Sequence, residues 1–137
     1  MTSSVLRTLP ETEKHTEAFW TGGSTGSLLI NRCQSCGHYI HPPVPMCPKC
    51  HSRDVKPEAV SGRATVISFT INYMPWVPDL PVPYIFAAVE LKEQPGLRLS
   101  TELINIAPEA VAIGMPVKVT FLQQEEIYLP LFEPIDT

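Results

Sequence analysis

The four cysteines of this 137-residue chain lie within 18 residues of one another, and they constrain its fold more than any other feature. They form two C-x2-C pairs separated by ten residues: Cys33, Cys36, Cys47 and Cys50. Each pair can form a tight turn that directs two sulfurs to one point, and two such turns complete the thiolate tetrahedron that Zn²⁺ prefers. The spacing therefore predicts one structural Zn²⁺ bound by these four residues, with no coordination position left for a substrate or a water.

Three other uses of these cysteines are chemically open. Two disulfides would require an oxidising compartment, but residues 1–10 lack the apolar segment of a secretory signal. We therefore expect a cytoplasmic protein with reduced thiols. A redox C-x-x-C would need one pair between a strand and a helix, rather than two pairs in a loop-rich stretch. Iron held by four thiolates has the same geometry and stays an alternative to zinc.

Three histidines lie close to the cysteines in sequence: His38, His41 and His51. A ligand set in which a histidine replaces a cysteine is the alternative they raise. Four thiolates already close a tetrahedral site, so we interpret the histidines as ordinary surface residues of a ribbon loop.

The charge and hydropathy of the chain argue against two classes of function. The net charge is -4, whereas duplex-DNA binders usually carry a basic stripe. Residues 28–57 do have an excess of cations, but a zinc ion bound by four thiolates carries two negative charges that these cations partly balance. There is no run of 18 apolar residues, so no membrane span is expected.

A helix is predicted before the first cysteine pair. Thr8 and Glu11 form a capping-box pattern, and Pro10 suits a first helical turn. Gly22-Gly23 is expected to end the helix, with Phe19 and Trp20 near its C-terminal end. Such a short helix is marginal alone, so its aromatic residues must dock either on this chain or on a partner.

The rest of the chain reads as mainly β. Apolar residues recur with a period of two in five segments: residues 62–73, 84–92, 97–104, 117–121 and 127–132. In the first segment Ile67, Phe69, Ile71 and Tyr73 are expected to share a face opposite Val66. A short helix or turn is expected at residues 107–113, between the third and fourth strands. This order predicts an OB-fold barrel, with a small sandwich or SH3-like barrel as the competitor. The predicted units are an N-terminal helical segment (1–26), a zinc ribbon (27–59) and an OB-fold domain (60–137).

The connection between the first two strands of this barrel is rich in proline. Residues 74–83 contain four prolines and a tryptophan. Proline lowers the entropy lost on docking, and tryptophan is enriched at binding hot spots. One interpretation is a partner-binding surface, and the other is a rigid loop that covers its own barrel. The residues predicted to contact a partner are Phe19, Trp20, Pro75, Trp76 and Pro78.

No residue pattern nominates a catalytic site. The chain lacks a Gly-rich phosphate loop, a G-x-S-x-G elbow and an H-E-x-x-H motif, and the metal uses all four cysteines. These observations predict a binding or scaffolding subunit rather than an enzyme acting alone. A binder of single-stranded nucleic acid is the alternative, because OB-folds supply stacking platforms and basic grooves.

The chain resembles the domain-of-unknown-function-35 (DUF35) family, in which a rubredoxin-like zinc ribbon precedes an OB-fold. The resemblance covers nearly the whole chain and is carried by an ordered set of blocks: Phe19-Trp20, Cys33 to Gly37, Pro42-Pro43, Cys47 to Cys50, Ser61 to Val66, Tyr84 to Leu91, Ile113 to Val117, and Leu129 to Pro134.

The resemblance implies a function that the residue patterns alone do not. Members of this family are similar to accessory subunits of thiolase-superfamily enzymes acting on acyl-CoA thioesters, including thiolases and aldolases of sterol side-chain degradation. It implies that the catalytic residues lie on the partner, that this chain stabilises the partner and helps to handle CoA, and that the assembly holds two copies of each chain.

Overall fold

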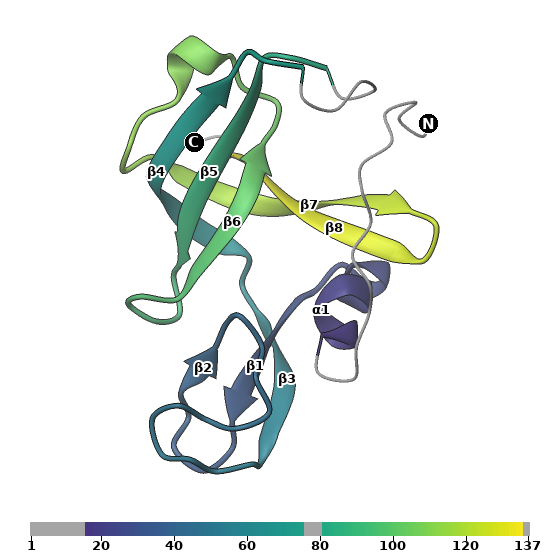
Figure 1. Ribbon diagram of the computed structural model, residues 1–137, viewed down its shortest axis with the longest axis vertical. Coiled ribbons are helices and arrows are strands. Elements are labelled where there is room, and N and C mark those ends of the chain that lie inside the picture. Colours follow the sequence, from purple (N-terminus) through teal and green to yellow (C-terminus); the bar gives the residue numbers. More distant parts are fainter. Residues whose placement is uncertain (1–15, 76–80, 136–137) are drawn as a thin grey trace.

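The computed structural model of the protein describes residues 16–75 and 81–135 and contains two β-sheets and one short helix (Figure 1). The first part of the chain forms a small antiparallel sheet in the order β2-β1-β3, preceded by a helical segment. Its elements are α1 (Glu17–Thr21), the 3-10 turn η1 (Gly22–Thr25), β1 (Leu28–Cys33), β2 (Tyr39–Ile40) and β3 (Val55–Val60). Among the helices of the described ranges, none has the length and apolar character to cross a bilayer.

The second part of the chain forms a closed five-stranded barrel in the order β4-β5-β6-β8-β7, with β7 returning to β4. Its elements are β4 (Arg63–Asn72), β5 (Tyr84–Leu91), β6 (Arg98–Leu103), the 3-10 turn η2 (Pro108–Ala110), β7 (Pro116–Gln124) and β8 (Ile127–Pro134). Closure in this order, with the short helical turn between the third and fourth strands, confirms the OB-fold over the sandwich alternative. The exact domain boundaries stay a prediction.

Period-two alternation positions the barrel core as expected in β5 and β6. The inward side chains of β5, Ile85, Ala87, Val89 and Leu91, are all 3% exposed or less. In β6 the inward positions are Leu99, Thr101 and Leu103, and the hydroxyl of Thr101 donates a hydrogen bond to the carbonyl oxygen of Pro130 at 3.1 Å. The outward residues of β5, including Phe86, are therefore left on the barrel surface.

The faces predicted for β4 are partly wrong, because the strand contains a β-bulge. The register with β5 shifts between Val66 and Ser68, which leaves Ile67 as the extra residue. Before the bulge, the even-numbered residue Val66 is fully buried in the core. After the bulge, the odd-numbered residues Phe69 and Ile71 are the ones that pack against the core. A strict alternation cannot anticipate this switch, and Tyr73, predicted to share the inward face, is 67% exposed.

Both helical segments end near the expected residues, with Gly22 as the C-cap of α1 and a short turn between β6 and β7. The α-helix stops at Thr21, but Gly22 and Gly23 continue in a 3-10 turn, and the left-handed residue that ends it is Gly26 with φ 78°. The capping-box residues Thr8 and Glu11 lie outside the described residues. Between β6 and β7, the segment expected at residues 107–113 contains only the three-residue turn η2.

The sequence patterns did not predict β2 and β3. The strand β2 has only two residues, and β3 contains Pro57 between the charged residues Lys56 and Glu58. Proline is tolerated in β3 because this strand lies at the edge of the sheet, where one set of backbone groups has no ladder partner. Pairing with β1, from Leu28 opposite Val60 to Cys33 opposite Val55, holds β3 in place.

One hydrophobic core joins the ribbon sheet, the helix and the barrel. Phe19 of α1 and Leu28 and Ile30 of β1 belong to the same buried cluster as the barrel residues. A Cβ at Gly23 would lie 2.5 Å from the Cβ of Tyr128 and 2.7 Å from the ring of Phe121, so the backbone of η1 is pressed against the β7–β8 hairpin. Figure 1 shows α1 beneath that hairpin and beside the ribbon sheet.

Candidate metal centre

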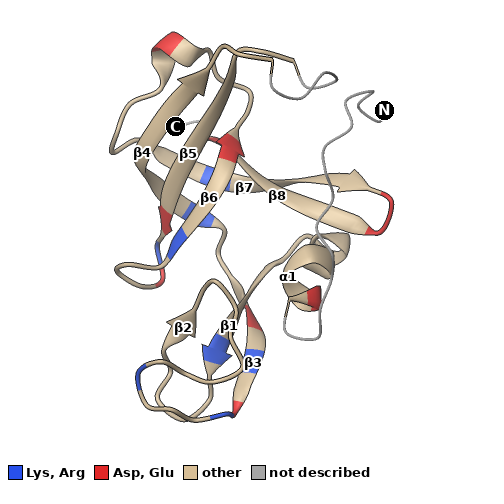
Figure 2. Ribbon diagram, viewed as in Figure 1, with Lys and Arg blue, Asp and Glu red and all other residues tan. Residues whose placement is uncertain are grey.

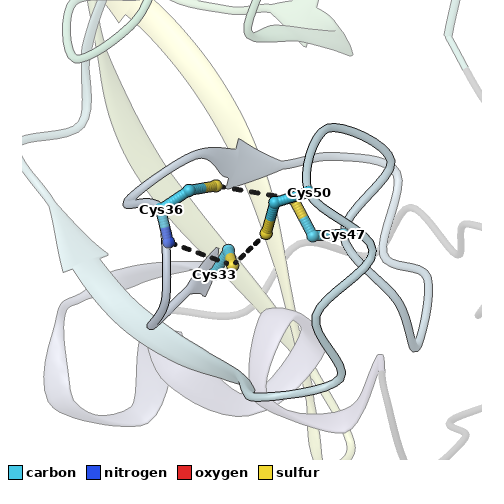
Figure 3. A group of neighbouring side chains, drawn as sticks. All are labelled: Cys33, Cys36, Cys47 and Cys50. Carbon is cyan, nitrogen blue, oxygen red and sulfur yellow. Dashed lines mark hydrogen bonds between the residues drawn. The ribbon is translucent and has the colours of Figure 1, made fainter.

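The four cysteines predicted to bind zinc converge at the end of the ribbon sheet (Figure 3). Their sulfur atoms all lie within 4.8 Å of one another. The Sγ atoms of Cys33 and Cys50 are 3.5 Å apart, and those of Cys36 and Cys47 are 3.7 Å apart. A tetrahedral zinc ion with Zn–S bonds of about 2.3 Å separates its sulfurs by about 3.8 Å, so the arrangement fits Zn²⁺.

The two cysteine turns repeat the same backbone pattern. The N–H of Cys33 donates to the carbonyl of His38, and the N–H of Gly37 donates to the carbonyl of Cys33, both at 2.9 Å. In the second turn, Cys47 donates to Ser52 at 2.8 Å and His51 donates to Cys47 at 2.9 Å. The equivalent residues Gly37 and His51 both have positive φ, 80° and 66°. A left-handed residue therefore follows the second cysteine of each pair.

Backbone amides stabilise the thiolate form of the two buried cysteines. The N–H of Cys36 lies 3.5 Å from the sulfur of Cys33, and this contact, opposed by burial, lowers the pKa of Cys33 to about 6. Burial raises the pKa of Cys47, but the N–H groups of Cys50 and Lys49 outweigh it and lower that pKa overall. Zinc binds the thiolate, so these amides favour the form that the metal needs.

A set of polar contacts around the cysteines fixes the ribbon loops. The hydroxyls of Ser35 and Ser52 are 2.9 Å apart and join the two turns. Arg32 donates to the carbonyl of Gly37 at 2.9 Å and lies 3.3 Å from the carboxylate of Glu58. The amide of Gln34, and after it Arg32, hold the pKa of Glu58 below its usual value. These contacts hold the loops that carry the four cysteines.

The histidines are not ligands of this cluster: among the described residues, the group that can hold a metal consists of the four cysteines alone. His38 and His51 contribute backbone hydrogen bonds to the turns. The ring of His41 lies 4.8 Å from the ring of Phe19, and burial lowers its pKa to about 4. His41 is therefore a packing residue between the ribbon loop and α1, and its interpretation as an ordinary surface residue was wrong.

The predicted partner contacts have different environments. Phe19 is only 9% exposed and packs edge-on against Trp20 at 4.8 Å, so it anchors the helix. Trp20 is partly exposed and Pro75 is exposed. Trp76 and Pro78 lie outside the described residues. The role of these residues in partner binding stays a prediction.

Sequence reasoning missed two features outside the metal centre. Gln94 of the β5–β6 turn hydrogen-bonds the main chain of Tyr39 in the ribbon, a contact for which the sequence gives no signal. Phe86 lines a surface groove with Trp20. The alternation of β5 did indicate the position of Phe86, because it places this apolar side chain on the side of the strand that faces away from the core.

Comparison with known proteins places this architecture in a family. Residues 20–56 match the rubredoxin-like zinc ribbon domain of ChsH2, and residues 57–122 match the C-terminal OB-fold domain of ChsH2. A DUF35 domain-containing scaffold protein of Methanocaldococcus jannaschii is 32% identical over 72% of this chain and 70% of its own length. The chain belongs to the DUF35 family. The rubredoxin-like ribbon and its four cysteines thus agree with a structural zinc ion in this DUF35 protein.

Two longer relatives carry names from acyl-CoA metabolism. A probable enoyl-CoA hydratase alpha subunit of Thermomonospora curvata is 40% identical over 85% of this chain. A 3-oxo-4,17-pregnadiene-20-carboxyl-CoA hydratase alpha subunit of Mycobacterium tuberculosis is 38% identical over 91% of the chain. The DUF35 chain spans only 37% and 39% of the length of these two relatives.

A solved structure matches the DUF35 chain over most of its length. This structure, the Ltp2-ChsH2(DUF35) aldolase, contains a chain that is 36% identical with a TM-score of 0.83. The match covers 92% of this protein and 98% of that chain.

Proposed function

We propose that this DUF35 protein is a non-catalytic accessory subunit that binds and stabilises a thiolase-superfamily enzyme, either a thiolase or a retro-aldolase, acting on acyl-CoA thioesters. The observation that carries the proposal is the likeness to the DUF35 chain of the Ltp2-ChsH2 aldolase, which extends over 98% of that chain. The named hydratase alpha subunit for a pregnadiene carboxyl-CoA supports a place in lipid or steroid side-chain metabolism.

The metal centre supports a structural rather than a catalytic role. Four thiolates complete a tetrahedron, so a metal bound there has no position for a substrate. All four cysteines of the chain are used in this way, which leaves no thiol nucleophile. In the proposed complex the enzyme partner supplies the reacting groups, and this subunit supports its fold and its handling of the CoA substrate.

The proposal extends to assembly and location. Two copies of each chain are proposed, because thiolase-fold enzymes are typically at least dimeric. A cytoplasmic location is proposed because thiolates remain reduced and available to zinc in that compartment.

Purification of the tagged full chain from cells of its native host tests the proposal. We expect one acyl-CoA-processing enzyme to co-purify in near-equal amount, identified by mass spectrometry, and to show higher thermal stability and acyl-CoA turnover with the subunit than without it. Recovery of nucleic acid in a salt-sensitive complex, or of no protein in near-equal amount, would contradict it and favour the single-stranded nucleic-acid binder.

A further inference from the structure

A group of large apolar side chains is exposed along β5 and at the base of the β4–β5 connection. Phe86 is 49% exposed, Tyr73 67%, Met74 53% and Val82 36%. They are close in the fold because Asn72, at the end of β4, pairs with Tyr84, at the start of β5. We call the outward side of β5, which carries Tyr84 and Phe86, the β5 face, and Tyr73, Met74 and Val82 lie near its end. Aromatic residues and methionine are enriched in the same way at the centres of protein interfaces.

The β5 face continues into a groove with a cavity volume of about 280 Å³. Side chains from four elements of the fold line this groove: Trp20 of α1, Tyr84 and Phe86 of β5, Glu102 of β6, and Leu129 of β8. It forms because β6 and β8 pair only at Leu103 and Phe132 and then diverge. The aromatic pair of α1 fills part of the gap, and its unfilled part is the groove.

The charge around the groove restricts its occupant. Glu102 is the charged residue among those described that line it. Arg98 lies at the far end of β6, beside a neighbouring hollow, and its guanidinium is 3.8 Å from Glu90. Figure 2 shows a basic position at the start of β6 and an acidic one at its other end. A nucleic-acid backbone would meet a carboxylate here instead of a cation, which disfavours binding of that polyanion.

A second copy of the chain also fits poorly. A symmetric pair uses the same patch on both subunits, so two copies meeting around this groove would bring Glu102 near its own equivalent. Like charges at an interface cost binding free energy. A different protein with a cation opposite Glu102 complements the charge of the groove better than a second copy does.

We propose that the β5 face and its groove are where the enzyme partner docks, with an apolar side chain of the partner inserted between Trp20 and Phe86 and a Lys or Arg of the partner against Glu102. This inference rests on the proposed function, because it assigns a surface to the partner invoked there. It narrows the general prediction of contacts in the helix and the proline-rich loop to a defined site, which keeps Trp20 of the helix and adds Phe86 and Glu102 of the barrel.

Variants of the full-length chain test the assignment. Phe86→Ser removes the exposed aromatic ring, and Glu102→Lys reverses the charge. The matched controls are Ile113→Ser, since Ile113 is 70% exposed, and Glu109→Lys in η2. Both controls lie near η2, across the barrel from α1 (Figure 1). Each protein is first checked for zinc content and thermal midpoint, so that loss of fold is not read as loss of binding.

The measurement is the amount of the acyl-CoA enzyme that co-purifies with each tagged variant, followed by titration calorimetry with the purified enzyme. We expect Phe86→Ser and Glu102→Lys each to weaken binding at least tenfold and both controls to bind as the original protein does. Binding of the enzyme unchanged by both test variants overturns the surface assignment and leaves the proposed function standing. If the original protein captures no such enzyme, the proposed function fails first, and this inference fails with it. A dimer of the free chain that Phe86→Ser dissociates would show that a second copy occupies the face, which also overturns the assignment.

Discussion

The side-chain amide of Gln94 pairs with the main chain of Tyr39 through two hydrogen bonds. The N–H of Tyr39 donates to Oε1 of Gln94 at 2.9 Å, and Nε2 of Gln94 donates to the carbonyl of Tyr39 at 3.0 Å. Gln94 lies in the β5–β6 turn of the barrel, whereas Tyr39 begins β2 of the ribbon. The side-chain amide thus pairs with Tyr39 as a neighbouring backbone would, and it connects the metal-binding ribbon to the barrel.

Replacing Gln94 should loosen this connection. Gln94→Ala is expected to lower the free energy of unfolding by about 1–3 kcal/mol, because a partly buried donor and a partly buried acceptor both lose their partner. Urea denaturation measures the change. Gln123→Ala is the control, since Gln123 makes an exposed hydrogen bond to Glu125 at 3.1 Å and its loss should cost less than about 0.5 kcal/mol. Equal effects of the two substitutions would show that the Tyr39 contact adds no stability.

Removing the metal should unfold the ribbon. A structural zinc site contributes on the order of 10 kcal/mol of folding free energy. A strong chelator, or Cys47→Ser at a fully buried ligand, is expected to abolish stoichiometric zinc and the protection of ribbon amides from hydrogen exchange. Ser35→Ala is the control, because it removes a contact between the turns but no ligand. A ribbon that stays protected after complete zinc loss would contradict a structural role for the metal.

His41 should make stability depend on pH in the acid range. Burial lowers its pKa from 6.5 to about 4 in the folded protein. Between these two values the unfolded chain binds a proton that the folded chain does not, so stability rises with pH in this window and is lost as pH falls from about 6.5 to about 4. The loss at the acid end is up to about 3 kcal/mol. Thermal midpoints of the zinc-loaded protein between these pH values, compared with those of His41→Phe, measure the effect. Parallel pH profiles for the two proteins would exclude His41 as its source.

Two glycines with the same backbone angle separate steric contact from conformational strain. Gly62 and Gly96 have φ values of 79° and 81°. A Cβ at Gly62 would lie 2.4 Å from Cγ1 of Val119, whereas a Cβ at Gly96 meets no atom within 4 Å. Gly96→Ala should therefore cost about 1 kcal/mol through strain alone, and Gly62→Ala should cost about 1–3 kcal/mol more through overpacking. Denaturant midpoints decide the comparison. A loss of stability at Gly62→Ala no larger than that at Gly96→Ala would mean that β7 shifts to make room for the new methyl group at no cost in free energy.

Several particular failures show what a local pattern cannot contain. The outward position of Phe86 follows from the alternation of β5, but the inward position of Val66 does not follow from that of β4, because the bulge at Ile67 depends on the register with β5. The strand β3 was missed because Pro57 is unfavourable in a strand interior and acceptable at an edge. Which strand lies at an edge is a property of the assembled sheet.

The sequence by itself determined the metal centre and the order of the barrel strands. Both are local: a C-x2-C turn directs its two sulfurs whatever surrounds it, and alternation over a few residues sets the faces of a strand that has no bulge. Only the tertiary structure decided how the ribbon joins the barrel and where the β5 face opens into a groove. These features depend on residues far apart in the chain, such as Tyr39 with Gln94, or Trp20 with Phe86 and Leu129. Their meeting is set by the packing of the whole core, which no short stretch of sequence encodes.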